Sequence, residues 1–420
     1  KCFNRSAHHA FDGSAGGPRD APGGILLAEL CETFEARFGR SPEAAARAPG
    51  RVNLIGEHTD YSGGLVLPCA IDRATWAAAA RRDDGRARVW SREIASGQGD
   101  GPQAFEVAAP KRSGGWIDYV AGVVQALAEA GHAPGGFDLA LASDVPLGSG
   151  LSSSASLEVA VATVLDALFG WGLSPLARAR IAHRAETRFV GVACGIMDPF
   201  ASALCQEGHA LRLDCRSEET CAIPFPAERP ALLLAHSGVR RELAAAAYNA
   251  RVAECEQALA GARKLGLEAD ALSALRDLVP EQLPALASVL APTPLRRVRH
   301  VISENARVDA LAAALAAGEL EAAGVILRAG MRSLRDDYEV STPELDLLCA
   351  AANDLPGVHG SRLTGAGWGG CTLHLVDRDA VPAVTERLGQ AFASAFGRRP
   401  PIWSLRPSAG AESLPLPGAP

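Results

Sequence analysis

The sequence has 420 residues and a formal net charge of −7. This charge excludes a protein that binds nucleic acid through an excess of Lys and Arg, because such binding depends on displacing counterions from phosphates. Hydrophobic residues make up 48% and charged residues 21% of the chain, which is the composition of a globular protein with room for two domains.

In chain order, the predicted strands are residues 50–56, 65–71, 74–80, 89–90, 137–142 and 371–376. The predicted helices are residues 25–39, a segment from Trp116, 155–170, a segment from Ser174, 241–265, 308–317, 344–353 and 380–396. Ser174 is expected to cap its helix, with Pro175 in the first helical position.

This content predicts an α+β protein in two lobes. The N-terminal domain is expected over residues 25–225 and the C-terminal domain over residues 226–406. Residues 1–24 are expected to form a disordered tail. The residues from Pro407 on are rich in Ser, Pro, Gly and Ala, and they are expected to form a loose tail as well.

Cysteine usage and the absence of long apolar runs indicate where the protein works. The ten cysteines include no Cys-x-x-Cys pair, so free thiols in a reducing compartment are expected. No apolar run reaches the about 20 residues that span a bilayer, so no membrane partner is expected. The N-terminal segment has no apolar core of the secretory kind. The expected location is cytoplasmic.

Residues 146–156, PLGSGLSSSAS, lie between a predicted strand and a predicted helix. Gly148 and Gly150 allow backbone N–H groups to turn inward, and a helix N-terminus attracts anions. One serine would suffice for a simple helix cap, so three serines after the glycines favour a phosphate-binding loop. The chain contains no Gly-Lys-Ser/Thr sequence, which excludes a Walker loop.

A second glycine-rich stretch, residues 363–370, formally contains Gly-x-Gly-x-x-Gly. A dinucleotide site would need a helix after it and an acidic residue about 20 positions further on. A strand follows instead, and Asp377 comes too early. We therefore predict that this loop lets the backbone pass close to a ligand or to another loop.

A third glycine-rich stretch carries four polar residues in a row, Glu57, His58, Thr59 and Asp60. Apolar segments lie on both sides of it, so packing does not explain these residues. Converging donors and acceptors of this kind suit a small molecule with many hydroxyl groups.

With these stretches in view, the sequence resembles the galactokinases of the GHMP small-molecule kinase superfamily. The resemblance covers residues 25–405, and its motifs are residues 48–71, 146–160, 194–200, 333–346 and 360–376. It implies an N-terminal lobe like ribosomal protein S5 and a C-terminal ferredoxin-like lobe with added helices. Pro199 and Trp368 depart from the family pattern, where Gln and Phe are usual, and Pro199 puts the geometry beside Asp198 in doubt.

The resemblance implies that ATP phosphorylates α-D-galactose at the C1 hydroxyl, in the first committed step of galactose metabolism by the Leloir pathway. Asp198 is then the proton acceptor, and Arg51 keeps it ionised and stabilises the transition state. Ser154 and Glu186 would hold Mg²⁺. The implied nucleotide-binding residues are Gly148, Ser149, Gly150, Leu151, Ser152, Ser153 and Ser154. The implied sugar-binding residues are Glu57, His58, Thr59, Asp60, Gly195 and Tyr248.

Read from the residues alone, Glu186 is an ordinary helix residue between arginines, Arg51 a surface arginine before a strand and Asp198 a loop cap. Two other functions remain open: another GHMP kinase, acting on mevalonate, homoserine, arabinose or N-acetylgalactosamine, and a galactose sensor without turnover. The complete serine run 152–156 argues against the sensor. The expected partners are ATP and galactose, with no nucleic acid, and the expected state is a monomer.

Overall fold

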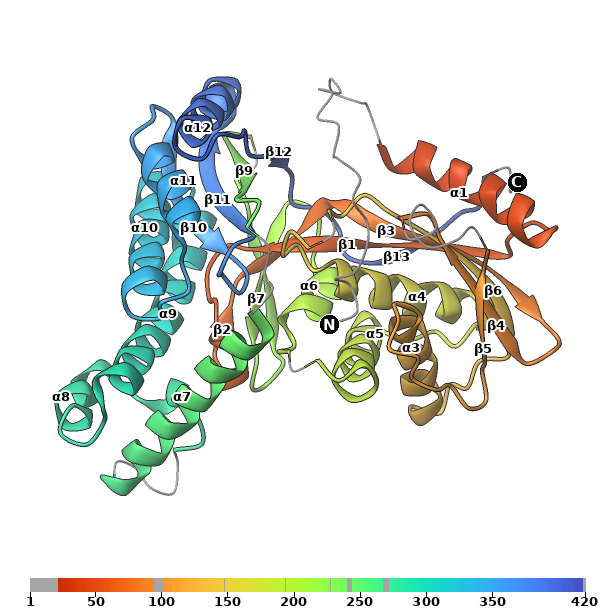
Figure 1. Ribbon diagram of the computed structural model, residues 1–420, viewed down its shortest axis with the longest axis horizontal. Coiled ribbons are helices and arrows are strands. Elements are labelled where there is room, and N and C mark those ends of the chain that lie inside the picture. The colour runs from red at the N-terminus through yellow and green to blue at the C-terminus, as the bar shows by residue number, and fades with distance from the viewer. Residues whose placement is uncertain are drawn as a thin grey trace.

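The computed structural model describes residues 22–93, 101–146, 148–192, 194–226, 228–239, 244–266 and 272–417. The chain forms two lobes that meet along one side (Figure 1). Residues 1–21, which make up most of the predicted N-terminal tail, lie outside the described part. The last three residues of that prediction, 22–24, belong to the first helix instead.

A six-stranded sheet forms the centre of the N-terminal lobe. Its order is β13 (Glu412–Leu414), β1 (Ala44–Asn53), β3 (Pro68–Arg82), β6 (Gly136–Ser143), β4 (Arg86–Ser91) and β5 (Gln103–Glu106). Neighbouring strands are antiparallel except for β4 and β6. Helix α1 (Pro22–Phe38) covers one face, and the other face carries α3 (Ile117–Glu129), α4 (Ser153–Phe169), α5 (Pro175–Arg184) and α6 (Met197–Leu204) (Figure 1).

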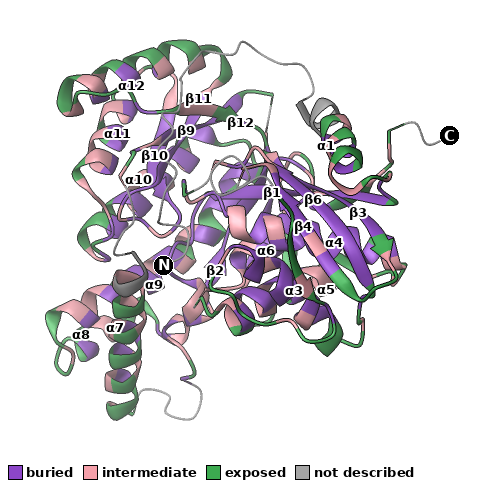
Figure 2. Ribbon diagram, turned by 45° about the vertical axis from the view of Figure 1, so that its right-hand side comes forward, coloured by how far each residue is buried: buried purple, intermediate pink, exposed green. Residues whose placement is uncertain are grey.

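Strand β3 is buried on both faces, because helices cover the sheet on both sides (Figure 2). Ala77 and Ala79 pack into the core under α3 and α4, whereas Trp76 and Ala78 pack under α1. The prediction of two strands over 65–71 and 74–80 is wrong, because β3 continues through its polar residues 72–73. These residues belong to a bulge in β3, where residues 71–73 lie opposite the single residue Gly50 of β1.

A four-stranded antiparallel sheet forms the centre of the C-terminal lobe, in the order β10 (Val358–Thr364), β11 (Cys371–Asp377), β9 (Pro230–His236) and β12 (Ile402–Leu405). Its helices are α7 (Ala244–Lys264), α8 (Leu283–Leu286), α9 (Pro292–Ala316), α10 (Leu320–Asp336), α11 (Pro343–Asn353) and α12 (Val381–Phe396). A small third sheet joins β2 (Leu65–Val66), β7 (His209–Asp214) and β8 (Thr220–Pro224).

Helix α9 is much longer than the predicted segment 308–317. Its first half carries many charged and polar residues, among them Arg297, Glu304 and Asn305, and these hid the helical pattern. Arg297 and Glu304 are nevertheless buried, because each pairs with opposite charges inside the lobe. By contrast, the predicted cap of α5 is confirmed, since the Ser174 side chain accepts a hydrogen bond from the Ala177 amide.

The prediction of a loose tail from Pro407 on is wrong for its described part. Strand β13 pairs with β1 at the edge of the large sheet, and Arg47 forms an ion pair with Glu412 at 2.7 Å. A bridge between Ile71 and Pro407 leads the chain back to this lobe. A three-residue strand in a Pro- and Gly-rich context has no pattern of its own, so only its partner strand defines it.

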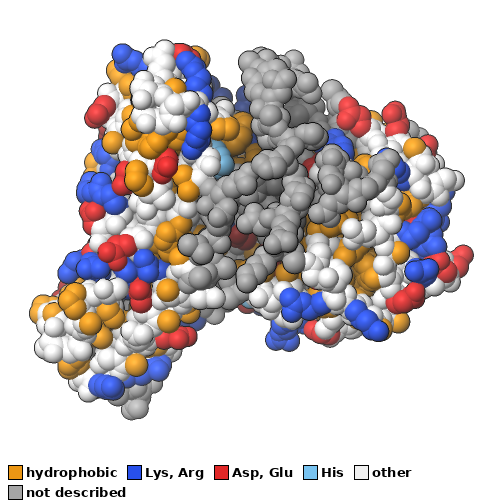
Figure 3. All heavy atoms as spheres, in the orientation of Figure 1, with side chains coloured by type: hydrophobic (Ala, Val, Ile, Leu, Met, Phe, Trp, Pro, Cys, Tyr) orange, Lys and Arg blue, Asp and Glu red, His pale blue; other side chains and the backbone are white. Residues whose placement is uncertain are grey.

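The described cysteines form no disulfide, as predicted: Cys31, Cys69, Cys194, Cys205, Cys215, Cys221, Cys255, Cys349 and Cys371. Among the described residues, no helix combines the length and apolar character needed to cross a bilayer. On the face of the molecule drawn in Figure 3, basic and acidic side chains are interspersed over both lobes.

A buried histidine in the C-terminal lobe leads to a prediction about acid stability. His374 is 0% exposed, and burial lowers its pKa to about 3. Between pH 6.5 and 3 the unfolded chain therefore binds a proton that the folded chain does not, so stability falls as the pH falls. From this residue alone we expect a loss of about 2 kcal/mol between pH 7 and pH 5.

The measurement is the free energy of unfolding in urea across this pH range. His374→Gln should reduce the pH slope by about one proton. Thr372→Val is the matched control, because the Thr372 hydroxyl bonds His374 Nε2 at 2.8 Å but does not titrate. An equal slope in wild type and His374→Gln would contradict the prediction.

Candidate active site

The loop between β6 and α4 forms the first part of the site. Gly148 and Gly150 have φ angles of 72° and 84°, and Ser152 is also left-handed, at 60°. Because a serine rarely adopts this conformation, the loop holds Ser152 in a strained position. Its hydroxyl does not cap α4 but donates to Asp198 Oδ2 at 2.5 Å.

The other predicted nucleotide-binding residues occupy different depths in this loop. Gly148 is exposed, whereas Ser153 and Ser154 are partly exposed at the start of α4. Ser149 is buried, and its hydroxyl donates to the Pro146 carbonyl at 2.6 Å. Leu151 is buried in the core. A ligand can therefore meet the side chains of Ser153 and Ser154, while Ser149 and Leu151 support the loop from below.

Arg51 and Asp198 form an ion pair at the inner end of this loop. Arg51 Nε and Nη2 donate to the two carboxylate oxygens of Asp198 at 2.8 Å each, and Nη1 donates to the Gly150 carbonyl at 2.7 Å. The side chain of Arg51 is 6% exposed and that of Asp198 is 30% exposed. The carboxylate is thus held by the arginine and still open to a substrate.

Pro199 follows Asp198 in the first turn of α6. The amide that proline lacks has no partner inside the helix at this position, so the ring is tolerated there. The doubt about the geometry beside Asp198 is thereby removed. Pro199 leaves α6 regular and Asp198 paired with Arg51.

Ser154 and Glu186 also lie together, as predicted. Ser154 Oγ donates to Glu186 Oε1 at 2.9 Å, and Cys194 Sγ donates to Oε2 at 3.5 Å. Glu186 lies on a π-helix, Ala185–Val190, that follows α5. Burial, and then the charge of Asp198, raise the pKa of Glu186. A cation between these two oxygens would stabilise the buried carboxylate, so the pair suits Mg²⁺ with its other positions left to phosphates and water.

Asp60, Gly195 and Tyr248 come together on the other side of Asp198. A Cβ atom at Gly195 would lie 1.7 Å from Asp60 Oδ2, so the carboxylate of Asp60 lies against the glycine backbone. Burial, and then the charge of Asp198, raise the pKa of Asp60 to about 6. Burial and the charge of Asp60 raise the pKa of Tyr248. Three separate segments therefore lie close to the carboxylates of Asp60 and Asp198.

His58 has both ring nitrogens engaged. Nε2 lies 2.9 Å from the Ala366 carbonyl, which only accepts, so Nε2 carries the proton. Nδ1 then accepts from the Tyr61 hydroxyl at 3.1 Å, and that hydroxyl lies 2.6 Å from Tyr338 Oη. Burial lowers the pKa of His58 to about 3, so the ring is neutral. Its neighbour Tyr248 has its ring centre 5.7 Å away.

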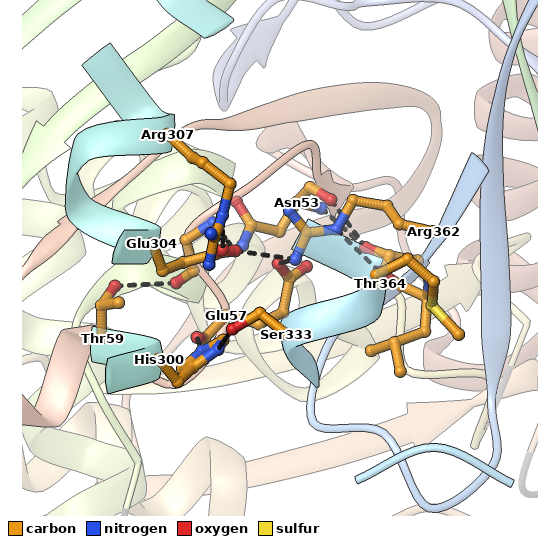
Figure 4. Close-up of polar contacts among 12 residues, drawn as sticks. Asn53, Glu57, Thr59, His300, Glu304, Arg307, Ser333, Arg362 and Thr364 are labelled. Atoms are coloured by element: carbon orange, nitrogen blue, oxygen red, sulfur yellow. Dashed lines mark hydrogen bonds and ion pairs between the residues drawn. The ribbon is translucent and has the colours of Figure 1, made fainter. Parts of the chain in front are cut away.

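The side chains of Glu57 and Thr59 bond other groups of the protein. The Thr59 hydroxyl bonds the carbonyls of Gly56 and Leu65, at 2.8 and 2.7 Å, and so supports its own loop. The carboxylate of Glu57 is buried and pairs with Arg362 (Figure 4). The structure thus brings Asp60, not all four polar residues, next to Asp198. Sugar contacts by Glu57 and Thr59 stay predictions.

Sequence reasoning missed the residues that hold this loop from behind, namely His300, Glu304, Arg362 and Tyr338, whose hydroxyl bonds Tyr61 of the loop. They lie more than 200 positions further along the chain than the loop, so no local pattern links them to it. Residues 363–370 were predicted to pass close to a ligand or to another loop, and the structure confirms the close approach to another loop. A Cβ atom at Gly367 would lie 2.3 Å from the Val340 carbonyl, so only glycine fits there.

The two lobes and the site agree with the comparisons to known families. Residues 118–206 match the model for the GHMP kinases N terminal domain, and residues 311–394 match the GHMP kinases C terminal model. A crystal structure titled as mevalonate kinase superposes with a TM-score of 0.62 at 17% identity, covering 86% of this chain and 98% of that one. The fold is that of a GHMP kinase.

The family within this class is also shown. Residues 32–81 match the galactokinase galactose-binding signature. A galactokinase of Roseiflexus sp. (strain RS-1) is 45% identical, covering 91% of this chain and 96% of its own length, and the galactokinase of Homo sapiens is 44% identical, covering 87% and 92%. The crystal structure of Lactococcus lactis galactokinase complexed with galactose has a TM-score of 0.87 at 34% identity, covering 93% and 100%. The chain belongs to the galactokinase family.

Proposed function

We propose that the protein transfers the γ-phosphoryl group of ATP to the C1 hydroxyl of α-D-galactose, giving galactose 1-phosphate and ADP. The observation that carries the proposal is the shared carboxylate of Asp198, which bonds both Arg51 and Ser152. A candidate base, a cation and the phosphate loop therefore meet at one point. The match of residues 32–81 to a galactose-binding signature supports galactose as the acceptor.

In the proposed mechanism, Asp198 accepts the proton of the C1 hydroxyl as O1 forms its bond to the γ-phosphorus. The bond from this phosphorus to the bridging oxygen breaks, and ADP leaves with the electron pair. Three hydrogen bonds from Arg51 and Ser152 orient the carboxylate. Arg51 also balances negative charge that builds on the transferred group.

Ser154 and Glu186 are the proposed ligands of Mg²⁺. The metal supplies neutralisation of the phosphate charge when bound. The residues of the loop at 148–154 then hold the phosphates through backbone amides, and the N-terminus of α4 favours their charge. Support comes from the 2.9 Å contact between Ser154 Oγ and Glu186 Oε1, which places two potential metal-ligating oxygens together.

The proposed sugar contacts are Asp60, Gly195, Tyr248, His58 and Asp198, with Glu57 and Thr59 completing the loop. Glu57 and Asp60 are proposed to select the axial 4-hydroxyl of galactose over the equatorial one of glucose. A site built to bond a hydroxyl leaves buried groups unpaired when that hydroxyl points elsewhere.

A coupled ADP-release assay across a panel of sugars tests the function. With galactose we expect turnover, and with glucose a kcat/KM at least about 100-fold lower, because the mismatched hydroxyl leaves polar groups unpaired. Phosphorus NMR of the product should show the phosphate at C1. Comparable kcat/KM values for the two sugars, or turnover of mevalonate alone, would contradict the proposal.

The proposal also places the protein in the cytoplasm as a monomer. The free thiols of the described residues support a reducing compartment. Cell fractionation and sedimentation of the purified protein test these two points.

A further inference from the structure

One face of α9 holds the backbone of the sugar loop, which we define as residues 54–65. His300 Nε2 donates to the Glu57 carbonyl at 3.0 Å, and Glu304 Oε1 accepts from the Gly56 amide at 3.0 Å. Asn305 Oδ1 accepts from the Leu65 amide at 2.8 Å. The spacing of four residues places His300 and Glu304 on one side of the helix, and Asn305 directly follows Glu304, so this part of α9 acts as a template for the loop.

Arg362 of β10 joins this helix to the Glu57 side chain. Its Nη2 donates to Glu57 Oε2 and, at 2.9 Å, to Glu304 Oε1 (Figure 4). Arg307 donates to the second oxygen of Glu304 at 2.7 Å. The side chains of Arg362 and Glu304 are both 0% exposed. One guanidinium therefore binds a carboxylate of the sugar loop and a carboxylate of the template helix at once.

The two carboxyl groups of this cluster, Glu304 and Glu57, differ in the direction of their pKa shifts. Burial raises the pKa of Glu304, but Arg362 and Arg307 together outweigh it and lower that pKa below its usual range. For Glu57 burial dominates, and the pKa rises to about 7. Glu304 is thus the lasting partner of Arg362, and Glu57 depends on both of them for its position.

The catalytic residues and the elements that carry this cluster belong to different lobes. Asp198, Arg51 and the phosphate loop are part of the N-terminal lobe, whereas α9 and β10 are part of the C-terminal lobe. The sugar loop follows β1 of the N-terminal lobe, yet its contacts to Arg362, Glu304 and His300 come from the other lobe. The place of a bound sugar relative to Asp198 is consequently set across the boundary.

We propose that Arg362 and Glu304 are positioning residues for the sugar: they clamp Glu57 and the sugar loop to the C-terminal lobe and so hold the acceptor hydroxyl in line with Asp198. The inference rests on the proposed function. It predicts an effect on the sugar and little effect on the nucleotide, because the phosphate loop lies outside the clamp.

The test uses Arg362→Lys, which keeps the charge but loses the planar fork, and Glu304→Gln, which keeps the shape but loses the charge. In both we expect KM for galactose to rise about 10-fold or more, the effect of losing a hydrogen bond to a charged group. KM for ATP should stay within about twofold, since Arg51 still bonds Asp198 and Gly150. If Arg362→Lys fails to fold, Glu304→Gln decides.

Asp138→Asn is the matched control, because Asp138 is a buried carboxylate on β6 that pairs with Arg40, Arg82 and Arg88. It should lower stability without changing either KM. Hydrogen exchange gives a readout that needs no sugar. The amides of Gly56 and Gly365, which bond Glu304 and Glu57, should exchange faster in both clamp variants, while the Arg51 amide should not.

The outcomes separate the clamp from the proposed function. Equal rises in both KM values, or an unchanged KM for galactose with a folded variant, would overturn the clamp. If the wild type neither turns over nor binds galactose, the proposed function fails. Faster exchange of the Gly56 and Gly365 amides would still support the clamp on the loop, and unchanged exchange would refute it.

Discussion

Asp198→Asn is expected to lower kcat by about 10²–10⁴-fold, the usual contribution of a general base. Asparagine has nearly the same shape but cannot take up the proton of the C1 hydroxyl. The loss should appear in kcat, with KM for galactose within a few fold, because Gly195, Asp60 and Tyr248 remain in place. The measurement is steady-state turnover together with calorimetric binding of galactose.

Ser152→Ala serves as the control for this variant. It removes the hydroxyl that donates to Asp198 Oδ2 but keeps the carboxylate and both hydrogen bonds from Arg51. We expect a loss of less than about 10-fold, as for one hydrogen bond that orients a group. Near-normal turnover by Asp198→Asn with galactose binding intact would show that another group takes the proton.

Arg51→Lys is expected to lower kcat by about 10²-fold, the scale of losing one donor that stabilises charge in the transition state. Lysine keeps a positive charge, but it cannot bond both oxygens of Asp198 and the Gly150 carbonyl in one plane as the guanidinium does. The base and the phosphate loop would then lose their common support. Steady-state kinetics with both substrates varied measures the effect.

Arg47→Lys on the same strand is the matched control for Arg51. Arg47 forms an ion pair with the half-exposed carboxylate of Glu412, and surface pairs of this kind contribute about 0–1 kcal/mol. Its kinetics should equal those of the wild type. If Arg51→Lys also left kcat nearly unchanged, a positive charge without the planar guanidinium would be sufficient at position 51.

The parts of the site that sequence reasoning located are those with a local signature. The phosphate loop is recognisable because a strand, two glycines and a helix follow one another, and the capping of α5 depends only on Ser174, Pro175 and Ala177. The α+β content and most of the described helices were predicted for the same reason, whereas α6, α8, α10 and the strands β5, β7, β8, β9, β10, β12 and β13 were not predicted. Asp198 and Glu186 needed the family resemblance, because each is a single carboxylate in an ordinary helical context.

The parts that escaped depend on partners far away in the sequence. Glu304 and Gly56 are 248 positions apart, and Arg362 and Glu57 are 305 apart. Only folding brings them together, and in isolation Glu304 looks like an exposed residue of a charged helix. The four polar residues at 57–60 show the same limit. Their chemistry predicted a site, but only the structure separates Thr59, which supports the loop, from Asp60, which faces Asp198.

Strand β13 has a consequence for how the protein is made. Strand β1, which carries Arg51 at one end, obtains its outer partner only from residues 412–414. During synthesis from the N-terminus, this edge stays unpaired until residues 412–414 have left the ribosome, and an unpaired edge invites association with other chains. The N-terminal lobe is thus completed only after the C-terminal lobe has been translated, and fusion partners attached near β13 will interfere with the pairing of β13 and β1.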